Sequence, residues 1–439
     1  MNDLVVKTKI GTALNHIPYS CVPGIGTTYK KHKDCIGGFK SYNVADRRQY
    51  VFERIHKIVK YAIENIPFYS SFYEQKGFKV EALKCFEDID KIPIVTKKDL
   101  MLVPLSMRSV KNKMSYVANT GGSTGVPLSF YKTRSQQIKE MAYYHNAWSK
   151  LGFSKSNLRL QFVGRSENEH IGYDFMRNRI SASIYMPFEK LIEELSLVCK
   201  NNIISYIQGY PSVIYEFATF LKDNPIQYDR CGLKGRIRGV FLNSEFPYLN
   251  YRRIIEETFE CKSVASYGQT EACVLAFDYG SGDYDVAQSY GYAEIKEIGG
   301  ENHLIGTSYD NYSSPFIRYD IGDTVDNATI NNGILNSFKM TNGGRIGQYI
   351  YDNAGKRISL TGLIFGKHHE LFNYCSQMQI SQSEQGKATV FYVAPEGNLH
   401  GIQPSDLFDA NDINISFDFV RIDNPIRTQN GKVLLLVKQ

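Results

Sequence analysis

Residues 238–271 read RGVFLNSEFPYLNYRRIIEETFECKSVASYGQTE. A short apolar run at 239–242 is followed by apolar residues spaced as on one face of a helix, and then by a second short run at 263–266. This order of strand, crossover helix and strand is typical of a parallel sheet. Ligands bind beyond the carboxyl ends of such strands, so we expect the segments 243–245 and 267–271 to face one crevice of an α/β protein.

The same analysis predicts three more helices. Apolar residues recur at steps of three and four over 51–62, 191–199 and 213–221, which places an apolar stripe on one face of each helix. Pro67 is expected to end the first of these helices, because its ring and missing N–H do not fit a helix interior. Ser212 is expected to be the N-cap of the third, because a serine hydroxyl accepts hydrogen bonds from exposed helical N–H groups.

Strand-like runs dominate the second half of the chain. Short runs at 292–298 and 304–308 are separated by glycine-rich turns, and two more runs follow at 388–394 and 415–422. Runs of this length with turns between them predict strands.

Two units are predicted, with the boundary at Gly343-Gly344-Arg345. We expect a large N-terminal domain at 1–344 and a small C-terminal domain at 345–439. Adjacent glycines at such a boundary can serve as a hinge.

Composition excludes several classes of protein. The chain has 439 residues, of which 43% are apolar and 22% charged, so a wholly disordered or collagen-like protein is ruled out. The 51 Lys and Arg against 45 Asp and Glu give a formal charge of +6, and we therefore expect no nucleic acid partner. No apolar run approaches the ~18 residues of a membrane helix, and residues 1–10 lack an apolar signal core. We expect no membrane span and a cytoplasmic location.

The eight cysteines are scattered, without a CxxC pair or a histidine at ligand spacing. This pattern predicts neither a zinc site nor a disulfide framework. We expect reduced thiols, most of them buried.

A glycine-rich segment is the first candidate for nucleotide chemistry. It reads Asn119-Thr120-Gly121-Gly122-Ser123-Thr124-Gly125-Val126-Pro127. Its glycines let the backbone approach a ligand and turn N–H groups toward an anion, and its hydroxyls add donors, which suits a polyphosphate. The GK[ST] ending of a Walker A loop is missing. An ordinary polar turn is the alternative.

The second candidate follows the second strand of the crossover unit and reads Tyr267-Gly268-Gln269-Thr270-Glu271. The aromatic face of Tyr267 can stack on a purine, and Gly268 avoids collision with it. The Glu271 carboxylate can hold Mg²⁺ that bridges phosphates. The alternative is a strand end that runs into a polar loop.

Three further candidates lie nearer the C-terminus. Asp323, in the segment PFIRYDIGD at 315–323, can accept hydrogen bonds from both hydroxyls of a ribose, because an ionised carboxylate is acceptor-only. Arg345 can contact ribose or phosphate, and Lys432 follows Asn430-Gly431. A surface hairpin is the alternative for Asp323, and a solvated side chain is the alternative for Lys432.

Taken together and in this order, the segments resemble the adenylate-forming superfamily of acyl-CoA synthetases and related ligases. Within it the chain looks like the phenylacetate-coenzyme A ligase family, with further matches at Ile66-Pro67-Phe68-Tyr69, Gly209-Tyr210-Pro211-Ser212 and Ser244-Glu245. The segments 349–359 and 377–380 are more similar to the branch associated with capsular polysaccharide biosynthesis.

The resemblance implies a fold and a reaction. The fold is a large N-terminal α/β domain with mixed and parallel sheets and a small, mobile α+β C-terminal domain. In the reaction, the carboxylate of a small-molecule acid attacks the α-phosphate of ATP and gives an acyl-adenylate and pyrophosphate. The acyl group then passes to an acceptor, which is coenzyme A or an amine or hydroxyl of a sugar precursor.

The resemblance also implies which residues hold the nucleotide. The loop from Thr120 to Gly125 would hold the β- and γ-phosphates, and Glu271 would hold Mg²⁺. The adenine would lie against Tyr267, the neighbouring Gly268-Gln269-Thr270 and the segment Ser244-Glu245.

The ribose and the reacting groups are assigned in the same way. Asp323 and Arg345 would hold the ribose, and the acid would lie against 209–211. Lys432, carried by the C-terminal domain, would bridge the attacking carboxylate and the α-phosphate.

The chain departs from the family at the hinge. Gly347 and Gln348 stand where an acidic residue is usual, two or three places after the motif arginine. This difference leaves a second class of function open, a non-catalytic nucleotide-binding protein that senses ATP or acts as a scaffold. Glu271, Asp323 and Lys432 favour the enzyme, because a binding protein has no need of the lysine.

Overall fold

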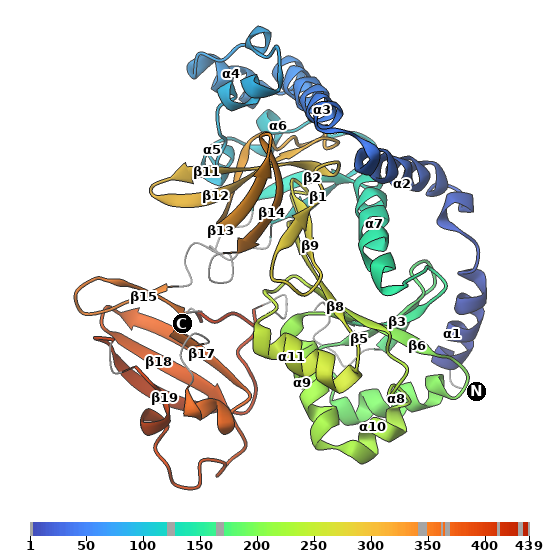
Figure 1. Ribbon diagram of the computed structural model, residues 1–439, viewed down its shortest axis with the longest axis vertical. Helices are drawn as coiled ribbons and strands as arrows, with labels where there is room; N and C mark the ends of the chain where they lie inside the picture. The colour runs from blue at the N-terminus through green and yellow to red at the C-terminus, as the bar shows by residue number, and fades with distance from the viewer. Residues whose placement is uncertain are drawn as a thin grey trace.

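A computed structural model describes the chain over residues 3–120, 128–163, 171–340, 349–360, 363–364, 369–410, 413–428 and 433–437, without the side chains of residues 357 and 359. Two units are visible in Figure 1, and each has its own large cluster of buried apolar side chains. The candidate residues for nucleotide chemistry that the structure describes all belong to the larger unit.

The larger unit begins with six helices, which are α1 (Asp3–Leu14), α2 (Gly26–Ser41), α3 (Val44–Asn65), α4 (Pro67–Gln75), α5 (Lys97–Met101) and α6 (Leu105–Arg108). The buried face of α3 consists of Val51, Ile55, Ile58, Val59 and Ala62, so the predicted stripe is confirmed. Pro67 is the first residue of α4 and α3 ends at Asn65, which confirms the predicted end of that helix.

One long mixed sheet forms the body of the larger unit. Over the described residues its strand order is β11-β12-β13-β14-β10-β9-β8-β7-β6-β3-β5-β4. The strands are β3 (Leu158–Val163), β4 (Ile171–Asp174), β5 (Arg179–Ser183), β6 (Ile204–Gly209), β7 (Gly239–Asn243), β8 (Ser263–Gly268), β9 (Leu275–Asp278), β10 (Tyr284–Val286), β11 (Gly291–Ile298), β12 (Glu301–Ser308), β13 (Tyr319–Asn331) and β14 (Ile334–Met340).

The direction of pairing changes at β8. Strands β5, β3, β6, β7 and β8 pair in parallel, whereas β8 pairs with β9 and β9 with β10 antiparallel. Strands β11 to β14 also pair antiparallel. The predicted crossover unit and the predicted runs at 292–298 and 304–308 are confirmed, as is the α/β fold class.

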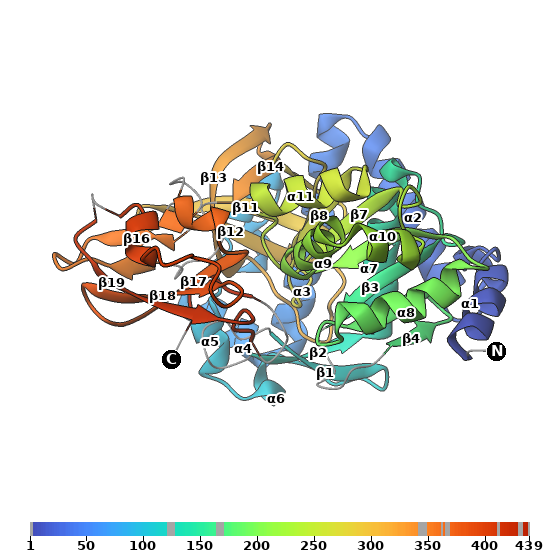
Figure 2. The ribbon, with the colours of Figure 1, turned by 90° about the horizontal axis from the view of Figure 1, so that it is seen from below.

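Helices cover both faces of the parallel half. Figure 2 shows α8 (Phe188–Cys199), α9 (Pro211–Asp223), α10 (Pro225–Cys231) and α11 (Leu249–Phe259) gathered on one side. On the other side Trp148 of α7 (Arg134–Trp148) stacks on Phe241 of β7, with ring centroids 4.3 Å apart. Helix–sheet packing on two faces buries the parallel strands, as such strands require.

The predicted N-cap of α9 is wrong. The cap residue is Tyr210, and Pro211 occupies the first helical position, so Ser212 lies inside the helix. Proline is favoured at that position because its missing N–H would be unpaired there in any case. The Ser212 N–H instead donates to a carboxylate from another segment, that of Glu245, at 3.2 Å.

A separate two-stranded sheet, β1 (Ser115–Asn119) with β2 (Ser129–Thr133), lies beside the large sheet and flanks residues 121–127. The C-terminal unit contains β15 (Tyr349–Tyr351), β16 (Arg357–Ser359), β17 (Gln377–Glu384), β18 (Lys387–Val393) and β19 (Ser416–Ile422). Strand β17 pairs antiparallel with β18, and β18 pairs parallel with β19. The strands predicted at 388–394 and 415–422 are confirmed.

Candidate functional site

The reversal between β8 and β9 carries the segment 267–271. Gly268 is paired with Leu275 across the two strands, so this segment forms the connection at the carboxyl end of β8. The sheet changes from parallel to antiparallel pairing here, and ligands of α/β sheets bind beyond the carboxyl ends of parallel strands. The fold therefore places the segment where a ligand is expected.

Tyr267 and Asp323 meet at this end of the sheet. The Tyr267 hydroxyl donates to Oδ2 of Asp323 at 2.6 Å, although 56 residues separate the two in sequence. The ring of Tyr267 stands edge-on against Phe338 of β14. Two motifs that were separate in the sequence analysis thus share one contact.

The other charged residues of the segment 315–323 have structural partners. Arg318, only 3% exposed, donates through Nε and Nη2 to the Glu294 carboxylate at 2.7 and 2.9 Å. Its Nη1 donates to the carbonyl oxygens of Asp90 and Ile92. Arg318 therefore ties the segment before Asp323 to the interior.

Asp320 is held in a similar way, since its Oδ2 lies 3.0 Å from Nδ1 of His303 on the neighbouring strand. Of the two aspartates in this segment, Asp323 is the one placed beside Tyr267. Arg318 and Asp320 therefore serve contacts within the fold.

Glu271 is a buried carboxylate, 8% exposed. Burial raises the pKa of its carboxyl above the ordinary value and nearby Asp323 raises it further, while Lys97 and Lys132 act in the opposite direction. Within the described ranges no cation forms an ion pair with it. A buried carboxylate suits a divalent cation, because bound Mg²⁺ is commonly held by one or two carboxylates together with phosphate oxygens.

Lys132, which the sequence analysis missed, connects the β1–β2 hairpin to this segment. Its Nζ donates to Oε1 of Glu140 at 3.0 Å and to the carbonyl oxygen of Thr270 at 3.3 Å. A lysine in an alternating strand carried no signal that could have singled it out. The contact fixes the backbone immediately before Glu271.

Thr120 closes the base of the glycine-rich segment. Its N–H donates to the carbonyl oxygen of Leu128 at 3.0 Å, and its hydroxyl accepts the N–H of Leu128 at 2.9 Å. These bonds join the two ends of residues 121–127. The predicted phosphate-binding residues Gly121, Gly122, Ser123, Thr124 and Gly125 lie outside the described residues.

Gly268 and Gln269 have local packing roles. A Cβ atom at Gly268 would lie 3.3 Å from Cδ1 of Leu275, tighter than ordinary van der Waals contact. The Gln269 amide, in the orientation that satisfies its neighbours, donates to the carbonyl oxygen of Val274 and accepts the N–H of the same residue. Both residues shape the connection between β8 and β9.

Ser244 and Glu245 lie at the contact between the two units. Ser244 has a left-handed backbone, with φ of 67°. The Glu245 carboxylate accepts the Ser212 N–H at 3.2 Å and the N–H of Val433, from the C-terminal unit, at 2.8 Å. Burial raises the pKa of the Glu245 carboxyl. The structure thus places this carboxylate against the backbone next to the predicted catalytic lysine.

Arg345 and Lys432, together with the hinge residues Gly347 and Gln348, lie outside the described residues. Across the part of the chain that is described, no three His, Cys, Asp or Glu side chains gather as metal ligands. No described helix is long and apolar enough to cross a bilayer.

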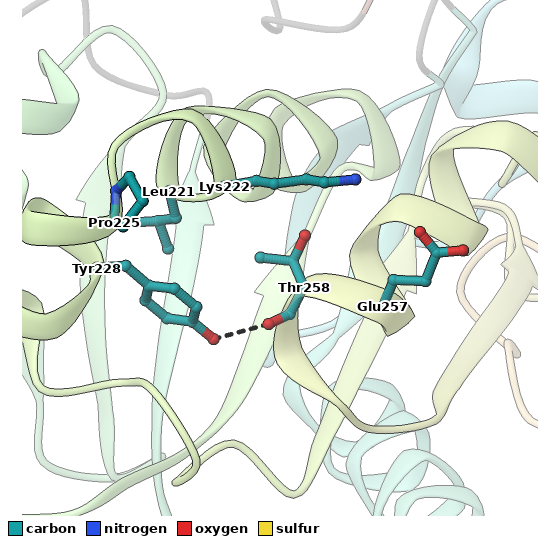
Figure 3. Close-up of a pocket in the computed structure, with 6 residues that line it drawn as sticks. All are labelled: Leu221, Lys222, Pro225, Tyr228, Glu257 and Thr258. Atoms are coloured by element: carbon teal, nitrogen blue, oxygen red, sulfur yellow. Dashed lines mark hydrogen bonds between the residues drawn. The ribbon is translucent and has the colours of Figure 1, made fainter.

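A hollow of about 210 Å³ lies between α9, α10 and α11, away from these residues. Figure 3 shows the side chains around it, including the Tyr228 hydroxyl, which donates to the carbonyl oxygen of Thr258 at 2.8 Å. None of the predicted site residues lines this hollow.

Comparison with known structures decides the fold. A 2-hydroxyisobutyryl-CoA ligase in the postadenylation state, bound to R3-HIB-AMP, superimposes with a TM-score of 0.64 at 17% identity, covering 91% of both chains. The chain has the adenylate-forming fold. A GH3.15 acyl acid amido synthetase superimposes with a TM-score of 0.57 at 11% identity, covering 90% of both chains. The resemblance predicted from the motifs is confirmed at the level of the fold.

Among curated proteins, the chain is similar to Protein CapK of Staphylococcus aureus, with 24% identity over 291 residues. The alignment covers 62% of this chain and 62% of that protein. No protein-family model matches the chain.

Proposed function

We propose that this protein is an AMP-forming ligase that activates a carboxylic acid with ATP as an acyl-adenylate. The observation that carries the proposal is the contact between Tyr267 and Asp323 beside buried Glu271, beyond the end of β8. In the proposal the ring of Tyr267 lies against the adenine, Asp323 accepts from the ribose and Glu271 holds the cation. Their position beyond the carboxyl end of β8, where α/β sheets bind ligands, supports these roles. The fold shared with AMP-bound ligases supports the same assignment.

The barrier to the first step is electrostatic, because a carboxylate anion approaches a polyphosphate anion. Positioning and charge stabilisation therefore account for most of the catalysis. In the proposal the backbone from Thr120 to Gly125 binds the terminal phosphates. Asp323 orients the ribose, and the hydrogen bond from Tyr267 holds the Asp323 carboxylate in place. Glu271 would hold Mg²⁺, and the bound ion would neutralise part of the phosphate charge.

The C-terminal unit completes the site in this proposal. Residues 345–439 act as a lid, with Arg345 on the ribose and Lys432 between the acid and the α-phosphate. Support comes from Val433, the neighbour of Lys432, whose N–H is bound by the large unit through Glu245.

The orientation of this lid is proposed to be the one used for adenylation. The same 2-hydroxyisobutyryl-CoA ligase gives TM-scores of 0.64 and 0.63 in its postadenylation state, against 0.52 in its thioesterification state. This chain is therefore more similar to the postadenylation form of that ligase than to its thioesterification form. The higher score supports an adenylation-type arrangement here.

The acceptor of the acyl group is proposed to be coenzyme A or an amine or hydroxyl of a sugar precursor. The 2-hydroxyisobutyryl-CoA ligase is known in complex with CoA, and the GH3.15 protein is an amido synthetase. The sugar precursor is included because segments 349–359 and 377–380 resemble the branch associated with capsular polysaccharide biosynthesis.

A panel of small carboxylic acids tests the proposal through ATP–pyrophosphate exchange, with mass spectrometry of any adenylate that co-purifies. Exchange with at least one acid, absent in Glu271→Gln, is the expected result. ATP binding without exchange across the panel would instead identify a nucleotide sensor or scaffold. Mass spectrometry of products formed with coenzyme A or with sugar amines then separates the two acceptors.

A further inference from the structure

The described residues on either side of positions 429–432, here called the two stems, are paired with each other. Arg427 and Val433 form an antiparallel bridge on either side of residues 429–432. Gln379 of β17, fully buried, holds both stems from within the C-terminal unit. Its Nε2 donates to the carbonyl oxygens of Ile426 and Leu434, and its Oε1 accepts the N–H of Ile426.

The first stem is bound by a carboxylate of the large unit. Nη2 of Arg427 lies 2.8 Å from both carboxylate oxygens of Glu216 on α9. Nε2 of Gln377 donates to the same carboxylate at 2.8 Å. The pair is mostly shielded from water, since the Arg427 side chain is 11% and the Glu216 side chain 22% exposed. Such charge-assisted bonds are roughly twice as strong as neutral ones.

The second stem is bound by another carboxylate of the large unit. Glu245 accepts the Val433 N–H with one oxygen and the Ser212 N–H with the other. Ser212 and Glu216 are four residues apart on α9, so they lie on one face of that helix. One turn of α9 therefore faces both stems of the loop.

We propose that Glu216 and Glu245 are positioning residues that hold the two stems of the 429–432 loop against α9 and so favour adenylation over acyl transfer. The inference rests on the proposed function, because it assigns these residues to one of its two steps. Each carboxylate acts through a stem, Glu216 through the Arg427 side chain and Glu245 through the Val433 N–H. Release of both contacts removes two of the polar contacts that hold the C-terminal unit in this orientation.

Hydrogen exchange of the folded protein tests the contacts without reference to activity. The variants are Glu216→Gln and Glu245→Gln, which keep side-chain size, and the matched control is Glu257→Gln, whose side chain is 50% exposed on α11 in an ion pair with Arg253. In both test variants, peptides that contain Val433 should exchange at least about tenfold faster, as expected for the loss of a charge-assisted hydrogen bond. Peptides from β7 should exchange as in the unaltered protein.

A kinetic measurement tests the consequence. Glu216→Gln and Glu245→Gln should slow ATP–pyrophosphate exchange by about tenfold or more, while acceptor-dependent consumption of added acyl-adenylate is unchanged or faster. Exchange of the Val433 peptides at the unaltered rate in both variants would overturn the proposal, and so would equal slowing of the two steps. If the unaltered protein makes no adenylate, the proposed function fails, and the hydrogen-exchange result alone then decides whether the contacts hold the loop.

Discussion

Ion pairs in the interior and between the units use the same chemistry in different surroundings. The interior pair Arg318–Glu294 is 3% and 8% exposed, and the arginine has two backbone carbonyl partners besides. The pair Arg427–Glu216 between the units is 11% and 22% exposed. A pair inside one unit cannot be opened without leaving a bare charge in the interior, whereas separation of the two units would expose both Arg427 and Glu216 to water. The difference teaches which contacts are permanent and which can be exchanged during a reaction.

The largest effect is expected in the interior. Arg318→Met should lower the free energy of unfolding by about 3–5 kcal/mol, because buried Glu294 then loses both bonds from Arg318 and keeps only Lys296, at 3.6 Å, as a cation. Denaturant titration measures this, with Lys113→Met at an exposed position as the control. If Arg318→Met lowers the free energy of unfolding no more than the control does, interior ion pairs do not differ from those between the units in the way described.

At Lys432, the proposed catalytic residue of the C-terminal unit, we expect an effect on the reaction rate instead of on stability. Lys432→Ala should slow adenylation by ~10² to 10³, or about 3–4 kcal/mol of barrier, because a preorganised donor is lost. ATP binding and the unfolding midpoint should stay the same. Pyrophosphate release at the unaltered rate with the true substrate would show that Lys432 has another role.

Glu271 is buried and is the proposed ligand of Mg²⁺, so we expect the rate of adenylation to depend on pH. Since its pKa is raised by burial, protons compete with the cation over a range that extends above the ordinary carboxyl pKa. At limiting Mg²⁺ the rate should rise with pH by about tenfold per unit below that pKa and then level off. At saturating Mg²⁺ the same rise in rate should occur at lower pH. A profile that is the same at both Mg²⁺ concentrations would contradict cation binding by this residue.

The smallest effect is expected at Tyr267. Tyr267→Phe removes the hydrogen bond to Asp323 and keeps the ring, so the KM for ATP should rise by roughly threefold to tenfold, the value of one hydrogen bond. Tyr116→Phe, at an exposed position on β1, is the control. An unchanged KM would indicate that Asp323 does not need this support.

Periodic patterns predicted the fold well, because the signal lies in the residues themselves. The stripe of α3 and the strands around 388–394 and 415–422 follow from the spacing of apolar side chains. The spacing of apolar residues does not predict short strands such as β10 (Tyr284–Val286), because three residues are too few to show an alternation.

The candidate site was predicted only in part, because contacts at long sequence range leave no local pattern. Ser212 was taken for a cap, yet the group bound to its N–H is a carboxylate 33 residues away. Glu216 reads as one more polar residue on a surface helix until Arg427, 211 residues later, is placed beside it. Tyr267 and Asp323 were found separately through chemistry, and the fold joins them.

The register of β8 and β9 also bears on how the chain can be altered. Gly268 and Leu275 face each other across the strands, so the six residues between them are fixed in number by ladders on both sides. Lengthening this turn by one residue would flip the alternation of either strand. A designer who wishes to alter the residues around Tyr267 and Glu271 should therefore keep the length of this span and change side chains elsewhere.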